Sequence, residues 1–171
     1  MEPIEAILTR RSIRKFSADL VTDGDLEIVL RAAMSAPSAF NERPWHFVVV
    51  RDSAMRERLS QISEWSGPMA GAQVGVVVCG DTEALRKPGT IYWVFDCAAA
   101  LENALIAANG HGLGAVWLGI HPTPERIGAV RELLGLPDHV EPLGMIALGW
   151  PGESKPPGER YDESRVHSER W

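Results

Sequence analysis

The sequence predicts one layered domain, residues 1–171, in which helices and strands intermingle along the chain. The chain has 171 residues, of which 45% are hydrophobic and 23% charged, the composition of an ordinary globular protein. A chain of this length buries roughly 70% of the surface that it exposes when unfolded. Segments with helical periodicity are separated by short apolar runs that are typical of strands. We therefore expect helices packed on a sheet around a real core.

The first half of the chain is expected to hold three helices and two strands. A short helix opens at Pro3, and a second one follows the capping residue Thr22 and carries an apolar stripe. Trp45 to Val50 is expected to form a strand buried on both faces, because nearly all of its residues are apolar. A third helix is expected after Asp52, and a strand over Val74 to Cys79.

The second half begins with the longest segment, Tyr92 to Asn109, which is rich in Ala and Leu and predicts a buried helix. It could be the central helix of the domain or the contact between two subunits. Strands are expected over Ala115 to Ile120 and over Pro142 to Leu148, with a helix between them that starts at Pro124 and ends at Gly135.

The last segment, residues 150–171, is a tail rich in Pro, Gly and charge, with no clear period. Tyr161 and Trp171 are unusual in a purely solvated tail. We therefore expect the tail to wrap around something, with a partner subunit as the candidate.

Composition and charge exclude several classes of protein. The net charge of −6 argues against a broad nucleic-acid surface. No apolar run approaches the roughly 20 residues of a membrane-spanning helix, and the acidic start, Met1 to Glu5, lacks the layout of a secretory signal, so a cytoplasmic location is expected. Cys79 and Cys97 are expected to be buried thiols, and the five scattered histidines indicate no metal site.

A basic motif, residues 10–15 (RRSIRK), places four cations within six positions of an acidic chain. Guanidinium groups match phosphate oxygens, and the hydroxyl of Ser12 and backbone N–H groups can complete such a site. The alternative is an ordinary solvated run of charge. Ile13 and Phe16 interrupt the charges as anchors would, which favours a segment held against a core and a phosphate-bearing ligand.

The sequence shows no side-chain machinery for hydrolysis. The glycines of residues 110–114 follow a helix and open a strand, the reverse of the order in a dinucleotide-binding fingerprint. There is no nucleophile elbow, Walker loop or plausible pair of carboxylates. A bound organic cofactor would therefore do the reacting, and flavin mononucleotide (FMN) fits, with one terminal phosphate and a flat ring.

Four segments together resemble the FMN-dependent nitroreductase family: residues 10–16, 36–45, 112–119 and 160–167. The resemblance covers nearly the whole chain, and it is the order of the four segments that makes it specific. It implies an α+β fold in which a central mixed β-sheet is flanked by helices. It also implies an intertwined homodimer with two FMN sites at the subunit interface.

The resemblance assigns the cationic residues to the cofactor. Arg10, Ser12 and Arg14 would contact the phosphate and ribityl groups, with Arg11 alongside, and Arg160 would approach the phosphate from the tail.

The flavin ring would meet a second group of residues. Pro37, Ser38 and Asn41 would come from the other subunit, while Leu118 and Gly119 would present backbone to the ring. The resemblance places the Gly119 N–H near the flavin N5, the atom that accepts hydride, so no side chain is expected to be catalytic.

One departure from the family pattern concerns residues 65–69. Longer members of the family carry an Asn and a Lys here, the Lys near the flavin N1 and O2, whereas this chain has Trp-Ser-Gly-Pro-Met. We expect backbone donors or an arginine from elsewhere to take the place of that cation.

The function expected from the resemblance is a ping-pong oxidoreductase. NADH or NADPH would reduce bound FMN and leave, and a nitroaromatic, a quinone or a similar electron-poor acceptor would take its place. Alternatives that keep the flavin are a flavin reductase, an enone reductase, a reductive dehalogenase and an enzyme that consumes the flavin. A non-catalytic flavin-binding protein is a further alternative, and a nucleic-acid-binding protein is a weaker one.

Overall fold

A computed structural model describes all 171 residues and contains one four-stranded sheet in the order β1-β2-β4-β3. Its strands are β1 (Trp45–Val50), β2 (Val74–Asp81), β3 (Gly114–Gly119) and β4 (Val140–Gly149). Each neighbouring pair runs antiparallel. The mixed sheet that we expected is therefore antiparallel among these four strands. The parallel pairing that the structure contains is an isolated bridge between Ser12 and Ala115.

The connections between the strands explain these directions. The helices α3 (Ser53–Ser60) and α4 (Pro68–Gly71) are too short to carry the chain back along the sheet, so β2 runs opposite to β1. In contrast, α5 (Tyr92–Gly110) has 19 residues and spans about 28 Å. It returns the chain to the other end of the sheet, so β3 runs in the direction of β2, with β4 between them.

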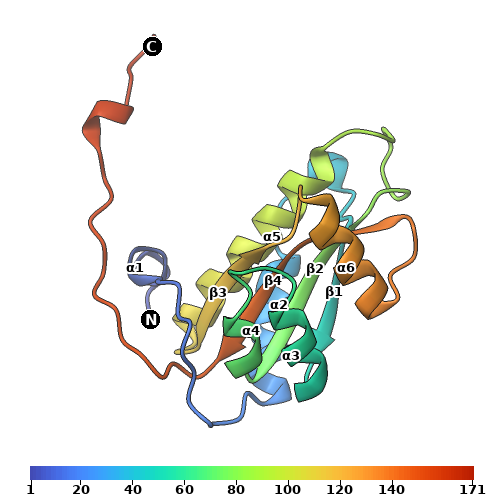
Figure 1. Ribbon diagram of the computed structural model, residues 1–171. Coiled ribbons are helices and arrows are strands. Elements are labelled where there is room, and N and C mark those ends of the chain that lie inside the picture. The colour runs from blue at the N-terminus through green and yellow to red at the C-terminus, as the bar shows by residue number, and fades with distance from the viewer.

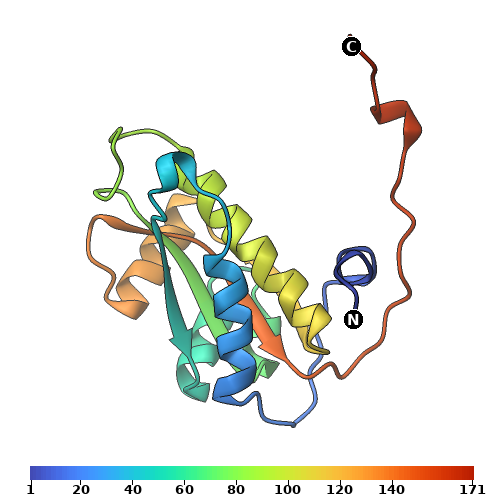
Figure 2. The same cartoon turned by 180° about the vertical axis from the view of Figure 1, so that it is seen from behind.

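The helices form a layer on each face of the sheet (Figures 1 and 2). The helices α2 (Asp23–Met34) and α5 cover one face, and α1 (Pro3–Thr9) packs beside α5. The short helices α3 and α4 cover the other face with α6 (Pro124–Leu134). Two 3₁₀ turns, η1 (Ala39–Asn41) and η2 (Glu163–Arg165), complete the α+β architecture.

The strand β2 supplies both cores because its side chains alternate between the two faces. Val76 and Val78 belong to the cluster under α2 and α5, whereas Val77 and Cys79 belong to the cluster under α3, α4 and α6. The prediction of buried thiols is confirmed for Cys79 and Cys97, and the Cys97 thiol donates to the Cys79 carbonyl at 3.5 Å. Burial raises the pKa of Cys79 to about 12 and raises that of Cys97 as well.

The prediction that Trp45 to Val50 is buried on both faces was wrong. Only Trp45 and Val50 are buried, and the side chain of Val49 is 38% exposed. The strand lies at the edge of the sheet and pairs with β2 alone, so no further strand or helix covers all of it. An apolar run in the sequence does not distinguish an edge strand from a central one.

The helix α5 is buried on one side only. Leu101 and Leu105 face the core, whereas Phe95 near its start is 58% exposed. The sequence prediction of a buried helix is thus correct for its inner face. Its outer face is apolar as well and stays exposed in a single subunit.

The tail leaves the body of the molecule after β4. Residues 150–156 lie along the basic motif, and the chain then runs beside α1 and away from the sheet (Figures 1 and 2). Every residue from 156 to 171 is exposed.

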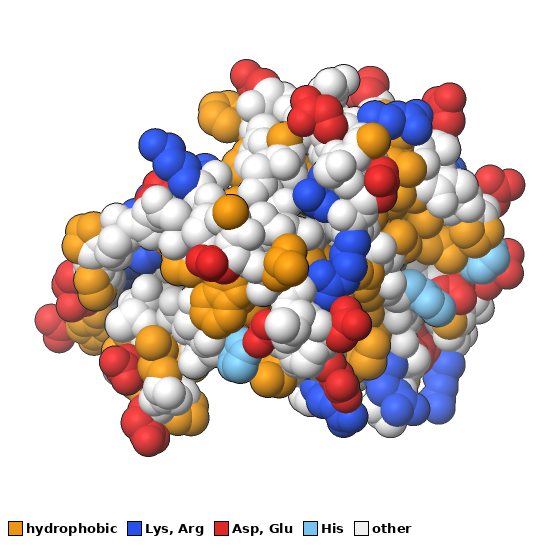
Figure 3. All heavy atoms as spheres, turned by 90° about the horizontal axis from the view of Figure 1, so that it is seen from below, with side chains coloured by type: hydrophobic (Ala, Val, Ile, Leu, Met, Phe, Trp, Pro, Cys, Tyr) orange, Lys and Arg blue, Asp and Glu red, His pale blue; other side chains and the backbone are white.

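The surface carries charges of both signs. On the face shown in Figure 3, acidic and basic side chains are interspersed, with hydrophobic side chains between them. None of the helices combines the length and the apolar character that crossing a membrane requires.

Candidate functional site

The basic motif is fixed to the sheet at the start of β3. The Ile13 N–H donates to the Ala115 carbonyl at 3.0 Å, next to the bridge between Ser12 and Ala115. Gly114 permits this approach, because a Cβ there would lie 2.7 Å from the Ile13 side chain. The expectation that the basic segment is held against a core is therefore confirmed.

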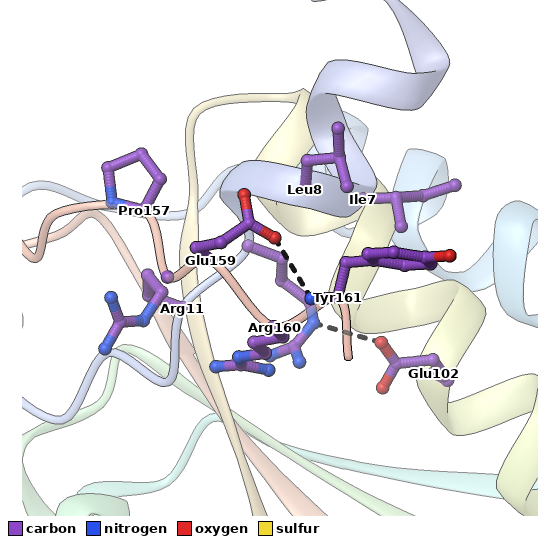
Figure 4. A pocket seen from close by; sticks show the side chains of 10 residues that line it. Ile7, Leu8, Arg11, Glu102, Pro157, Glu159, Arg160 and Tyr161 are labelled. Carbon is purple, nitrogen blue, oxygen red and sulfur yellow. Dashed lines mark hydrogen bonds and ion pairs between the residues drawn. The ribbon is translucent and has the colours of Figure 1, made fainter. Parts of the chain in front are cut away.

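A cavity of about 440 Å³ opens beside the motif (Figure 4), within the range of small-molecule sites. It brings together the guanidinium-bearing residues Arg10 and Arg11 of the motif and Arg160 of the tail. The remaining lining comes from α1, α5 and the tail: Ile7, Leu8, Glu102, Pro157, Gly158, Glu159 and Tyr161.

Arg10 is oriented by a carboxylate from α5. Its Nε lies 3.0 Å from Glu102 Oε1 (Figure 4). This ion pair uses the inner nitrogen of the guanidinium, so its two terminal nitrogens are left to bind a ligand. Arg11 donates through a terminal nitrogen to the Pro156 carbonyl, which ties the motif to the tail.

The charge of the cavity is moderately positive. Arg10, Arg11 and Arg160 face two carboxylates, Glu102 and Glu159. The Glu159 carboxylate accepts the Tyr161 backbone N–H at 3.0 Å within the tail. Three cations against two anions, with an apolar wall from α1, suit an anionic group attached to an apolar body.

The other two residues predicted for the phosphate, Ser12 and Arg14, do not line this cavity. The Ser12 carbonyl accepts from Lys155 Nζ at 2.6 Å, and the Arg14 N–H donates to Glu153 Oε1 at 2.6 Å. Their backbone is therefore held by the tail.

The loop that carries Pro37, Ser38 and Asn41 lies away from the cavity, near the first turns of α5. The Ser38 hydroxyl accepts the Arg43 N–H at 2.9 Å. Asn41 has a φ of 57°, in the left-handed region that costs a non-glycine residue free energy. One subunit therefore does not bring this loop to the three arginines of the cavity.

A buried carboxylate holds this loop in place. Asp96 Oδ1 accepts the Ala39 N–H at 2.9 Å, while Oδ2 has no hydrogen-bond partner. Burial raises the pKa of Asp96, and the Ala39 hydrogen bond opposes that rise.

The end of β3 presents open backbone. Leu118 is buried, whereas no atom lies within 4 Å of the position that a Cβ of Gly119 would take. The Gly119 carbonyl accepts from a terminal nitrogen of Arg126 at 3.3 Å. A flat ligand can approach Gly119 without meeting a side chain there.

Residues 65–69 supply no cation. Trp65 is exposed, and the buried Ser66 shares a hydrogen bond of 2.8 Å with the Ser63 hydroxyl. What takes the place of the missing lysine stays a prediction.

Sequence reasoning missed Glu102 and Tyr161 in the cavity and Glu153 and Lys155 behind the motif. The signal for Glu102 was present, because it is one of two acidic residues in an otherwise apolar helix. Glu153 and Lys155 carried no signal, because their partners lie about 140 positions away in the sequence.

Comparison with known proteins identifies the family. The model described as the nitroreductase family matches residues 7–90 and 66–150. A relative from Archaeoglobus fulgidus, provisionally named NADH dehydrogenase/NAD(P)H nitroreductase, is 43% identical over 173 residues, 99% of each chain. A crystal structure from Parabacteroides distasonis with the same provisional name matches with a TM-score of 0.93 at 36% identity, covering 99% of this chain and 98% of that one.

A third similar protein was solved with a cofactor. This is a provisionally named nitroreductase from Desulfovibrio desulfuricans in complex with FMN, with a TM-score of 0.85 at 30% identity, covering 100% of this chain and 98% of that one. In sequence and in structure alike, the likeness extends over the whole chain. The chain belongs to the nitroreductase family.

Proposed function

We propose that this protein is a homodimeric oxidoreductase that binds FMN and uses it to transfer electrons from NADH or NADPH to a small electron-poor acceptor. The observation that carries the proposal is the meeting of Arg10, Arg11 and Arg160, from opposite ends of the chain, at one cavity. The FMN in the Desulfovibrio desulfuricans relative and the NAD(P)H in the name of the Archaeoglobus fulgidus relative support it.

The residues present fit FMN. The three guanidinium groups offer a phosphate more donors than the carboxylates of the cavity occupy. The open backbone at Gly119 leaves room for the flat ring. Bound there, FMN would supply the redox chemistry, taking a hydride from NAD(P)H and passing electrons to the acceptor.

The protein's own part is binding, orientation and electrostatics. Arg10, Arg11 and Arg160 would neutralise the phosphate, and Ser12 and Arg14 would complete its surroundings through the motif. The backbone of Leu118 and Gly119 would face the ring, with the Gly119 N–H donating toward its reactive edge. No side chain is required to act as a nucleophile.

The proposal includes a second subunit. The loop with Pro37, Ser38 and Asn41 stands apart from the cavity in one subunit, so a second subunit would bring its own copy to the ring. The exposed apolar residues of α1, α5 and the tail support an interface, since such surface is usually covered. The tail, residues 150–171, would wrap around the partner as part of a single domain of residues 1–171.

The finer points of the activity rest on the sequence, which contains no second nucleotide-binding motif, so that one face of the ring would serve both substrates. Donor and acceptor would use it in turn, which is a ping-pong mechanism, and nitroaromatics or quinones are the proposed acceptors. The cytoplasmic location remains a prediction of the sequence.

The test is an anaerobic titration of the FMN-loaded protein with NADH and, separately, with NADPH, followed by visible absorbance. The proposal expects the flavin band to bleach with at least one donor and to return when a nitroaromatic or a quinone is added. If neither donor bleaches the flavin band of the FMN-loaded protein, the proposed enzymatic function is contradicted, and the non-catalytic flavin-binding protein is the alternative that remains.

A further inference from the structure

The tail makes a second set of contacts, which are to backbone atoms of the basic motif and not to its guanidinium groups. Glu153 Oε1 accepts the Arg14 N–H at 2.6 Å and the Lys15 N–H at 3.3 Å. A single carboxylate oxygen thus binds two consecutive backbone donors of the motif. Hydrogen bonds to a charged acceptor are the stronger kind.

Lys155 completes this arrangement from two positions further along the tail. Its Nζ lies 3.0 Å from Glu153 Oε1 and donates to the Ser12 carbonyl at 2.6 Å. About a quarter or less of each of the two side chains is exposed, so solvent screens the pair less than a fully exposed one. Together they bind the backbone of three residues of the motif.

The backbone of the tail is shaped to lie against the motif. The Gly152 N–H donates to the Lys15 carbonyl at 2.8 Å, and a Cβ at Gly152 would come within 2.9 Å of the Phe16 backbone. Only glycine permits that approach. The hydrogen bond from the Ile13 N–H to β3 fixes the other side of the motif, so the motif is held between the strand and the tail.

We propose that Glu153 and Lys155 are positioning residues of the phosphate site, which set the backbone of residues 12–15 so that the arginines of the motif meet the phosphate in a fixed geometry. Neither side chain needs to touch the ligand. Glu153 and Lys155 do not line the cavity that holds the three arginines Arg10, Arg11 and Arg160. The inference rests on the proposed FMN site and adds two residues to it.

The charge state of Glu153 agrees with this role. The Arg14 N–H bond, followed by the Lys155 contact, lowers the pKa of the Glu153 carboxyl below its usual value. The carboxylate is therefore ionised at neutral pH, as the ion pair with Lys155 requires.

The test compares the affinities for FMN and for riboflavin, which has the same ring and ribityl chain but no phosphate. The variants are Glu153→Ala and Lys155→Met, with Glu57→Ala as the control, because Glu57 is an exposed glutamate of α3, outside the motif, the tail and the cavity lining. The dissociation constants are measured by quenching of ligand fluorescence. Circular dichroism and thermal melting verify that each variant is folded.

If Glu153 and Lys155 position the phosphate site, each variant should bind FMN about tenfold more weakly. This is the lower end of the range of losses expected when a hydrogen bond to a charged group is removed. Affinity for riboflavin should stay within about twofold of the wild type, within the usual scatter for remote substitutions, and Glu57→Ala should change neither value. The double variant should lose little more than one single variant, because the two residues act as a unit.

Unchanged affinity for FMN in both variants would overturn the inference. An equal loss of affinity for FMN and for riboflavin would also overturn it, because it would indicate a structural role. If Glu153→Ala does not fold, Lys155→Met decides alone, since its side chain is partly exposed. A wild-type protein that binds FMN no better than riboflavin would instead contradict the proposed phosphate site itself.

Discussion

Arg10 is the residue on which the proposed phosphate site depends most. Glu102 holds its inner nitrogen at 3.0 Å, so the terminal nitrogens are pre-oriented for a ligand. We expect Arg10→Ala to weaken FMN binding by about 1.5 to 3 kcal/mol, the range for a hydrogen bond to a charged group. Titration of the protein with FMN measures this as a rise in Kd of roughly tenfold to 150-fold.

The control for Arg10→Ala is Arg58→Ala, which removes an exposed arginine of α3 far from the cavity lining. It should leave the Kd for FMN unchanged. An equal Kd for Arg10→Ala and Arg58→Ala would reassign the basic motif to ordinary solvated surface.

Asp25 links the start of α2 to the end of α5, and it makes a pH-dependent contribution to stability. The Thr22 side chain and then His111, whose Nε2 lies 2.8 Å from Asp25 Oδ1, lower the pKa of Asp25 from 3.8 to about 2. A carboxyl with a lowered pKa in the folded state stabilises the protein above its unfolded pKa and loses that effect as the pH falls through the folded pKa.

We therefore expect Asp25→Asn to lower the melting temperature at pH 7 and the difference from wild type to shrink as the pH falls from about 5 toward 3. Thermal melts followed by circular dichroism measure it. The control is Glu132→Gln, at an exposed glutamate of α6, which should leave the melting temperature at pH 7 unchanged. A constant difference for Asp25→Asn would contradict the assigned interaction.

The residues of the site were predictable where the sequence itself places them together. Arg10 and Arg11 are neighbours in the chain, and their cluster of charge stands out in an acidic protein. Glu102 and Lys155 were not predicted, because nothing local in the sequence indicates that an α5 carboxylate or a tail lysine reaches the motif. Such contacts arise only when the tertiary fold brings distant segments together.

The elements were largely predictable from periodicity. The capping residue Thr22 begins α2 as expected, and Gly135 ends α6 in the left-handed conformation. The partial exposure of β1 was not predictable, because an apolar run of six residues has the same appearance in the sequence at the edge of a sheet as in its centre. The strand directions depended on the lengths of the connecting helices.

The tail divides into two parts with different tasks. Residues 150–156 bind the motif of their own subunit. Residues 157–171 begin with five residues that line the cavity and are exposed throughout, with Tyr161 73% exposed. We expect deletion of residues 157–171 to weaken the dimer, because this part would cover the partner. It should also weaken FMN binding, since Arg160 is lost.

Sedimentation velocity over a concentration series measures the dimer of the shortened chain. Arg160→Ala in the full chain serves as the control, because it should lower FMN affinity without changing the dimer. A shortened protein that stays dimeric at every concentration at which the wild type does would contradict the role of residues 157–171.

On the scale of the whole molecule, the outer face of α5 is the proposed contact with a second subunit. Phe95 is 58% exposed on a helix whose other face is core. We expect Phe95→Glu to shift the protein toward monomers, because a charge buried at an interface is costly. Size-exclusion chromatography with light scattering measures the mass, and Leu20→Glu, at an exposed leucine outside the helices, should leave the mass unchanged. A Phe95→Glu protein with the mass of the wild type would place the interface elsewhere.

The central claim is that two subunits together hold FMN, with the phosphate bound at the three arginines of one subunit. A crystal structure of the protein grown with FMN tests it most directly. We expect the phosphate within hydrogen-bond distance of Arg10, Arg11 and Arg160, and the ring between Gly119 of the same subunit and the 37–41 loop of the other. A phosphate outside the cavity lined by the three arginines, or a ring contacted by one subunit alone, would contradict the account.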